Sequence, residues 1–77
     1  MRHISETTGC TVFTNFNADK TVTINIYGLS PLYVETEVSE QMERYGAKHF
    51  FCDPYEVTRQ KRGNWGTTLQ FWQEEGR

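Results

Sequence analysis

Alternating apolar and polar residues between positions 55 and 72, interrupted once by Arg62-Gly63-Asn64, constrain the fold of this chain more than any other feature. A period of two is typical of β-strands, and glycine beside asparagine is typical of a tight turn. The stretch therefore predicts a β-hairpin with a basic tip. Residues 11–16 and 21–27 alternate in the same way and predict another hairpin.

The loop length of the 55–72 hairpin decides which side chains share a face. A two-residue Gly63-Asn64 turn sets Val57 against Gln70, whereas a three-residue loop over residues 62–64 sets Val57 against Leu69. A shift of one residue would move every side chain of a strand to its other face. Only the three-residue loop gathers apolar residues on one face, so we predict that register. It also sets Tyr55 against Phe71 and Lys61 against Trp65, the latter as a cation–π pair.

In the earlier hairpin the residues of the face expected to be covered carry even numbers on both strands. They can face each other only across a loop of odd length, three or five residues. We expect residues 17–20 to supply this turn, since asparagine and aspartate favour turns. The face expected to be covered carries Val12, Phe16, Val22, Ile24, Ile26, Tyr55, Val57, Leu69 and Phe71.

A helix is expected between Ser30 and Gly46. Serine is a favoured N-cap, the proline that follows suits the first helical position, and glycine commonly ends a helix. Residues 32–38 also alternate, so a strand there is the alternative. We favour the helix because one apolar stripe continues at helical spacing through Pro31, Val34, Val38, Met42 and Tyr45.

The remaining segments complete a single domain over residues 1–77. Residues 1–9 lack periodicity and are expected to form a loosely ordered lead-in, and residues 76–77 a frayed end. Residues 47–52 predict a buried strand that Asp53-Pro54 interrupts. The predicted fold class is α+β, a single antiparallel sheet of about four strands with one helix packed on one face, in the order β-β-α-β-β.

Composition narrows the cellular setting. The chain has 77 residues and a net charge of −2, which argues against binding to nucleic acid through overall charge. It has neither the apolar core of a signal peptide nor an apolar run long enough to span a membrane. We therefore expect a cytoplasmic protein that has no membrane partner and keeps Cys10 and Cys52 as free thiols.

The sequence offers little material for catalysis. Zinc sites usually combine two close pairs of Cys or His ligands, but His49 and Cys52 have only the distant His3 and Cys10 as partners. No glycine-rich phosphate loop is present. We therefore expect no enzyme, no catalytic residues, no metal site and no cofactor.

Two surfaces are candidates for binding a partner. The basic tip holds Arg59, Gln60, Lys61, Arg62 and Trp65, and the uncovered sheet face is expected to hold Phe13, Tyr27 and Trp72. Tryptophan and arginine dominate many interfaces, so these eight residues form the predicted contact surface. A secondary acidic surface is expected on the helix at Glu37, Glu40 and Glu43.

These surfaces favour a small non-catalytic protein-binding module. We expect an inhibitor or regulator that occupies a surface of a host protein or complex, in the style of small anti-defence proteins of phages and mobile elements. The alternative is a nucleic-acid-binding domain that uses the basic hairpin tip on phosphate and the open aromatic face on bases. A homodimer would be another way to cover the open face.

Overall fold

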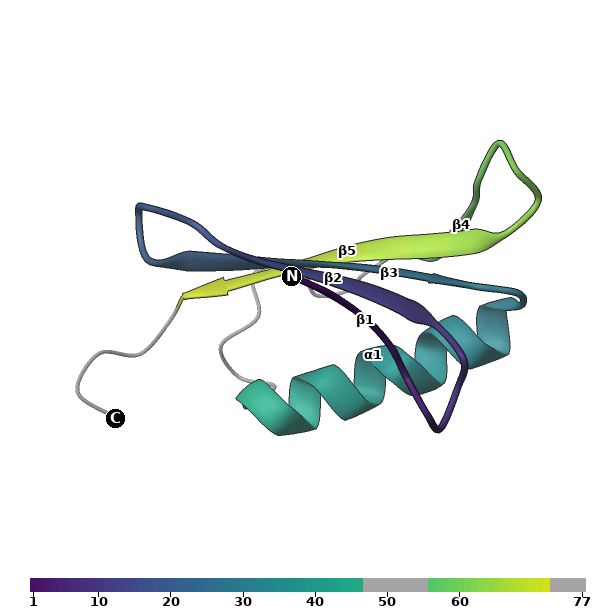
Figure 1. The fold of residues 1–77 in the computed structure, drawn as a ribbon, viewed down its shortest axis with the longest axis horizontal. Coiled ribbons are helices and arrows are strands. Elements are labelled where there is room, and N and C mark those ends of the chain that lie inside the picture. Colours follow the sequence, from purple (N-terminus) through teal and green to yellow (C-terminus); the bar gives the residue numbers. More distant parts are fainter. Residues whose placement is uncertain (47–55, 73–77) are drawn as a thin grey trace.

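One helix packs against one face of a five-stranded antiparallel sheet (Figure 1). The structure is a computed structural model that describes residues 1–46 and 56–72. The sheet order is β1-β2-β3-β5-β4. The α+β class and the helix on one sheet face are confirmed. The elements are β1 (Arg2–Ile4), β2 (Thr11–Phe16), β3 (Thr21–Gly28), α1 (Pro31–Tyr45), β4 (Thr58–Arg59) and β5 (Trp65–Trp72).

Strand β1 lies inside the segment expected to be a loose lead-in, and it raises the number of strands to five. It pairs with β2, setting Arg2 against Phe13. The pairing extends to Met1, whose amine donates to the Thr14 carbonyl at 2.8 Å and whose carbonyl accepts from the Thr14 amide at 2.7 Å. Backbone hydrogen bonds to β2 hold this strand in place, and they do not require alternating side chains. The sequence of residues 2–4 therefore gave no pattern from which the strand could be predicted.

The β2–β3 hairpin has the predicted odd loop. Phe16 pairs with Val22, and the Asn17 amide donates to the Thr21 carbonyl at 2.8 Å. Three residues, Ala18-Asp19-Lys20, remain in the loop, and Lys20 takes a left-handed backbone with φ of 70°. This is a common three-residue hairpin loop, in which the last residue is left-handed.

The register predicted for the β4–β5 hairpin is wrong by two residues. Arg59, and not Lys61, lies opposite Trp65, and the same shift separates Val57 from Leu69. The loop is Lys61-Arg62-Gly63, closed by a 2.7 Å bond from the Gln60 amide to the Asn64 carbonyl. Gly63 takes the left-handed position with φ of 85°, which glycine occupies without a steric cost. A shift of two keeps the side chains of the strands on their predicted faces and moves Lys61 into the loop.

The helix begins and ends as predicted, and the strand alternative over residues 32–38 is wrong. Ser30 has an extended backbone, and its hydroxyl accepts from the Tyr33 amide at 3.4 Å. Gly46 follows the last turn with φ of 86°. Val34 and Val38 are fully buried, and Tyr45 packs on Phe71 with ring centroids 4.8 Å apart.

The core lies between α1 and the inner strands of the sheet, mainly β3 and β5. Phe16 has the predicted covered-side register but is exposed, since the helix packs on β3 and β5 rather than over the end of β2. Tyr55, the strand predicted over residues 47–52, its interruption at Asp53-Pro54 and the frayed end lie outside the described residues. The buried apolar residues are Cys10, Val12, Val22, Ile24, Ile26, Val34, Val38, Leu69 and Phe71.

Within the described ranges, no helix is long and apolar enough to cross a membrane.

Candidate binding face and basic groove

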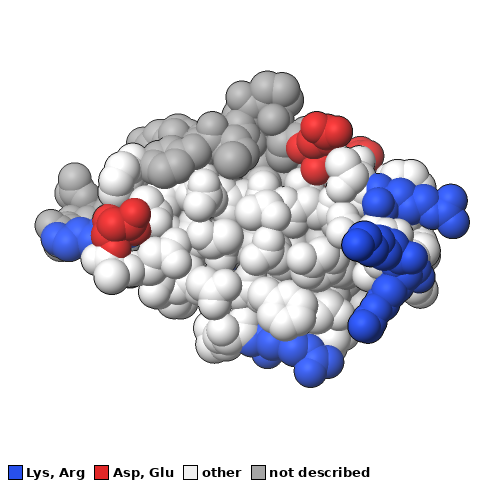
Figure 2. Space-filling model, turned by 90° about the horizontal axis from the view of Figure 1, so that it is seen from above, with Lys and Arg blue, Asp and Glu red and all other residues white. Residues whose placement is uncertain are grey.

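The sheet face opposite α1 is the open face, formed by the outward residues of all five strands (Figures 1 and 2). Among the described residues its middle carries no charged side chain, and the largest group of cations lies at the end of the sheet where the β4–β5 loop lies, with others at the rim of the face. Large aromatic residues of the open face remain accessible to solvent: Phe13 is 36% exposed and Trp72 is 54% exposed. Trp72 thus lies on the predicted side of the sheet.

The polar side chains of the open face bond to one another across the strands. Thr68 donates its hydroxyl to the Asn25 amide oxygen at 2.7 Å, and the Gln70 amide lies 3.3 Å from the Thr23 hydroxyl. The Asn17 amide also donates to the Thr23 hydroxyl at 3.0 Å. Polar groups that already have partners lose less when water is removed. The middle of the open face is therefore suited to burial against another surface.

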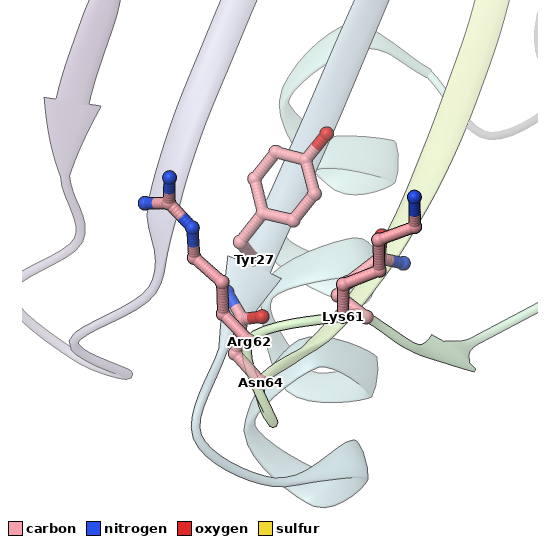
Figure 3. Close-up of a pocket in the computed structure, with 5 residues that line it drawn as sticks. Tyr27, Lys61, Arg62 and Asn64 are labelled. Carbon is pink, nitrogen blue, oxygen red and sulfur yellow. The ribbon is translucent and has the colours of Figure 1, made fainter.

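A shallow groove of about 390 Å³ lies at the tip end of the open face (Figure 3). Its floor is Tyr27 from β3, and Lys61 and Arg62 lie on either side of the ring in the view of Figure 3. The residues that line it are Tyr27, Gln60, Lys61, Arg62 and Asn64.

Gly66 lets the Tyr27 ring lie against the sheet. These residues are direct partners between β3 and β5, and a Cβ at position 66 would come within 2.6 Å of Tyr27 Cδ1. Phe13 supports the ring from the β2 side, with centroids 5.9 Å apart and planes at 74°. An edge-to-face contact of this kind fixes ring orientation.

Gln60 is held on the β4 side of the groove. Its side-chain amide donates to the Thr58 hydroxyl at 3.1 Å and to the Thr58 carbonyl at 3.3 Å. The same amide nitrogen would lie 3.2 Å from a Cβ at position 66. The groove is therefore lined by Tyr27 of β3 and by residues of the β4–β5 connection, and Gly66 of β5 lies next to both Tyr27 and Gln60.

The eight predicted contact residues do not form one site. Tyr27, Gln60, Lys61 and Arg62 line the groove, and Phe13 adjoins it. Trp72 lies at the other end of β5, opposite Thr21. Trp65 packs against the core on the helix side, and Arg59 is its cross-strand partner. The predicted cation–π pair is therefore replaced by a pairing of Trp65 with Arg59 in the sheet register.

Sequence reasoning missed three features of the surface. Asn64 lines the groove, and Gly66 supports it. An isolated glycine inside a strand pattern often marks close approach of another group, so Gly66 did carry a usable signal. The third feature is an exposed apolar cluster around the start of the helix, formed by Leu29, Leu32 and Tyr33.

The acidic residues of α1 differ from the exposed surface that was expected. Glu37 is only 2% exposed, so its assignment to that surface is wrong. Its carboxylate accepts from the Gln41 amide at 2.7 Å and from the Thr8 hydroxyl at 2.8 Å. Glu40 and Glu43 are exposed, and Glu40 accepts from the Thr7 hydroxyl at 2.7 Å. Glu37 and Glu40 therefore attach the β1–β2 loop to the helix.

Several hydrogen bonds together outweigh the effect of burial on the pKa of Glu37. Burial on its own raises the pKa of this carboxyl, but the hydrogen bonds from Gln41, Ser5 and Thr8, together with the charge of His3, bring its pKa below the ordinary value. Glu37 is therefore held as a carboxylate inside the structure, where it contributes to stability.

Cys10 is a buried free thiol. Burial raises its pKa, the nearby carboxylates of Glu37 and Glu40 raise it further, and a hydrogen bond involving Thr8 opposes them. A thiol with a raised pKa is a poor nucleophile. His49 and Cys52 lie outside the described residues. Across residues 1–46 and 56–72, no cluster of three or more His, Cys, Asp or Glu side chains is placed to hold a metal ion.

Neither a scan of protein-family models nor searches of curated proteins and of solved structures found a match to this chain. The function is therefore argued from the geometry of the open face and of the groove.

Proposed function

We propose that this chain is a small non-catalytic protein-binding module that acts as an inhibitor or regulator by occupying a surface of a partner protein or complex through its open face. The observation that carries the proposal is an uncovered, uncharged sheet centre whose polar groups are paired with one another, next to exposed aromatic residues. The anti-defence style of phage and mobile-element proteins is the biological setting that we favour, by analogy of size alone.

The energetics of desolvation support a protein partner. A buried polar group without a hydrogen bond costs about 1–3 kcal/mol, and the Asn25–Thr68 and Thr23–Gln70 pairs avoid that cost when the face is covered. The same pairing makes these amides and hydroxyls less available for hydrogen bonds to the edges of nucleic-acid bases. The sheet centre therefore favours docking over sequence readout.

Exposed aromatic residues support the same conclusion. Burying a large apolar side chain contributes about 1.5–3 kcal/mol, and aromatic residues are frequent energetic centres of interfaces. Trp72 and Phe13 lie on the open face at positions separated along the sheet, so a partner that covers both spans most of that face.

The nucleic-acid alternative draws support from one observation, the tip groove with its aromatic floor and two cations. It ranks second because the cations lie at the rim of the open face, most of them at the tip end, and do not follow a path across it (Figure 2). A strand of nucleic acid that crossed the sheet would meet an uncharged centre, and phosphate contacts supply most of the affinity in such complexes.

Affinity capture tests the proposal. Tagged protein is incubated with lysate of the source cell, with and without nuclease, and retained partners are identified by mass spectrometry. We expect specific partners that survive nuclease and are lost in a Phe13→Ala/Trp72→Ala variant, because its two truncations remove the exposed aromatics of the open face.

The matched control is Leu32→Ala, which removes an exposed apolar residue from the helix side. It should retain the partners if the open face is the interface. Loss in Leu32→Ala with retention in the double variant would place the interface at the helix start and refute the proposal. Circular dichroism and thermal unfolding must show that both variants are folded.

A further inference from the structure

We propose that the tip groove binds a nucleotide, either free or within a single strand of nucleic acid, with the base stacked on Tyr27 and the phosphate held by Lys61 and Arg62. This goes beyond the proposed function because it concerns a separate site at one end of the open face. The groove volume of about 390 Å³ falls within the range of small-molecule sites.

The aromatic floor of the groove indicates that one part of the ligand is a flat ring. In Figure 3 the helix lies behind the sheet and the Tyr27 ring presents one of its faces outward. Gly66 and Phe13 both lie next to the ring, and their contacts hold its orientation. The face of an aromatic ring is electron-rich, so it disfavours a bare carboxylate and accepts a flat ring by stacking.

The two cations determine the second part. Lys61 and Arg62 are consecutive loop residues, yet in Figure 3 their side chains lie on opposite sides of the ring. An anionic group attached to a ring stacked on Tyr27 would therefore lie near both cations. Arginine matches the geometry of phosphate oxygens, and lysine provides a compact charge.

The open-face strand positions around the groove add no negative charge, although acidic side chains lie beside the cations at this end of the molecule (Figure 2). Open-face positions of the five described strands carry no aspartate or glutamate, and β1 adds Arg2 on the same side as Phe13. Asn64, at the groove wall, has an amide that can donate and accept hydrogen bonds. A flat ring with a phosphate, which is the chemistry of a nucleotide, matches all of these groups.

Titration of the ¹⁵N-labelled full-length protein by NMR tests this inference. The probes are adenosine 5′-monophosphate, inorganic phosphate, a 15-nucleotide single-stranded oligodeoxyadenylate and a hexaglutamate peptide. We expect adenosine monophosphate or the oligonucleotide to shift the amide signals of Tyr27 and residues 60–66 saturably, and inorganic phosphate to bind at least fivefold more weakly. Preference for the oligonucleotide would identify single-stranded nucleic acid as the source of the nucleotide, and equal affinity would identify the free nucleotide.

Three variants separate stacking from charge. Lys61→Gln/Arg62→Gln should lower the affinity at least tenfold, and Tyr27→Leu at least fivefold, while Tyr27→Phe keeps the ring and should bind nearly as the parent does. The control is Arg59→Gln, which removes a charge from the same hairpin on the helix side and should bind as the parent does. Tyr27→Phe and the double variant keep the test decisive if Tyr27→Leu does not fold.

Four results would overturn the inference. They are no saturable shifts with any nucleotide probe at about 10 mM, inorganic phosphate binding as tightly as the nucleotide, equal binding of hexaglutamate, and oligonucleotide binding that Tyr27→Leu leaves unchanged. None of them would affect the proposed function, whose capture experiment depends on Phe13 and Trp72.

Discussion

Lys20 and Gly63 occupy the same position in two loops of the same design. Each is the third residue of a three-residue hairpin loop, each has a positive φ (70° and 85°), and the amide of each donates to the residue that opens its loop. Only Gly63 takes this conformation without a steric cost, because Lys20 carries a side chain. The two tips therefore differ in backbone strain although their hydrogen bonding is alike.

Replacing Lys20 by glycine should stabilise the protein. Relief of the left-handed strain is worth up to about 1 kcal/mol after the entropic cost of glycine is counted. Urea unfolding of the parent and of Lys20→Gly measures the difference. An unchanged or lower free energy of unfolding would mean that contacts of the Lys20 side chain outweigh the strain.

Replacing Gly63 by alanine should destabilise the protein by about 1–2 kcal/mol. A Cβ at this position would meet no atom within 4 Å, so the loss would arise from the backbone alone. Gly63→Asn is the matched control, because asparagine tolerates the left-handed region and should cost less. Equal losses in both variants would contradict this account.

Substitution of Gly66 should affect the groove as well as stability. In Gly66→Ala the new methyl group would meet Tyr27 Cδ1 at 2.6 Å and Cε1 at 2.9 Å, so the ring must move away from β5. We expect a loss of about 1–3 kcal/mol and altered ring-current shifts at Phe13 and Tyr27. Unchanged aromatic shifts in the NMR spectrum of the folded variant would show that the ring does not rest on Gly66.

Glu37 should make stability depend on pH. Its pKa in the folded state lies below the ordinary value of 4.5, so its stabilising effect is complete above that pH and is lost as the pH falls through the lowered pKa. Glu37→Gln should therefore cost about 1–2 kcal/mol at pH 7 and progressively less in acid, as measured by urea unfolding at pH 7 and pH 3.

Glu43→Gln provides the comparison for Glu37, since it makes the same change in charge at an exposed position of the same helix. Its effect on the free energy of unfolding should stay within about 0.5 kcal/mol at both pH values. A pH-independent loss in Glu37→Gln would indicate a packing role for the side chain and not a role for its charge.

Local rules predicted the helix and the faces of the sheet. Ser30 and Gly46 set the ends of α1 through their own backbone chemistry, and the alternation of apolar residues assigned each strand face. Alternation could not separate registers that differ by two residues, because both place the same side chains on the same face. The left-handed position of Gly63 selects the observed register.

The candidate site was less predictable because it depends on partners far apart in the sequence. The buried Glu37 carboxylate accepts hydrogen bonds from Thr8 in the β1–β2 loop as well as from Gln41 one helical turn away. The groove combines Tyr27 of β3 with a loop more than thirty residues later in the chain. Composition identified the basic tip, but only the fold showed that Arg59 lies on the other side of the sheet from Tyr27.

The position of β5 has a consequence for the moment at which this protein becomes able to bind. This strand is inserted between β3 and β4 although it follows β3 by some forty residues in the chain. During synthesis the β2–β3 hairpin and α1 emerge first, while the edge of β3 that will pair with β5 stays without its partner. Gly66 and Trp72 reach their places only after residue 72 has left the ribosome. The binding face is therefore completed only once β5 has paired with β3, and a chain that ends before β5 should fail to bind.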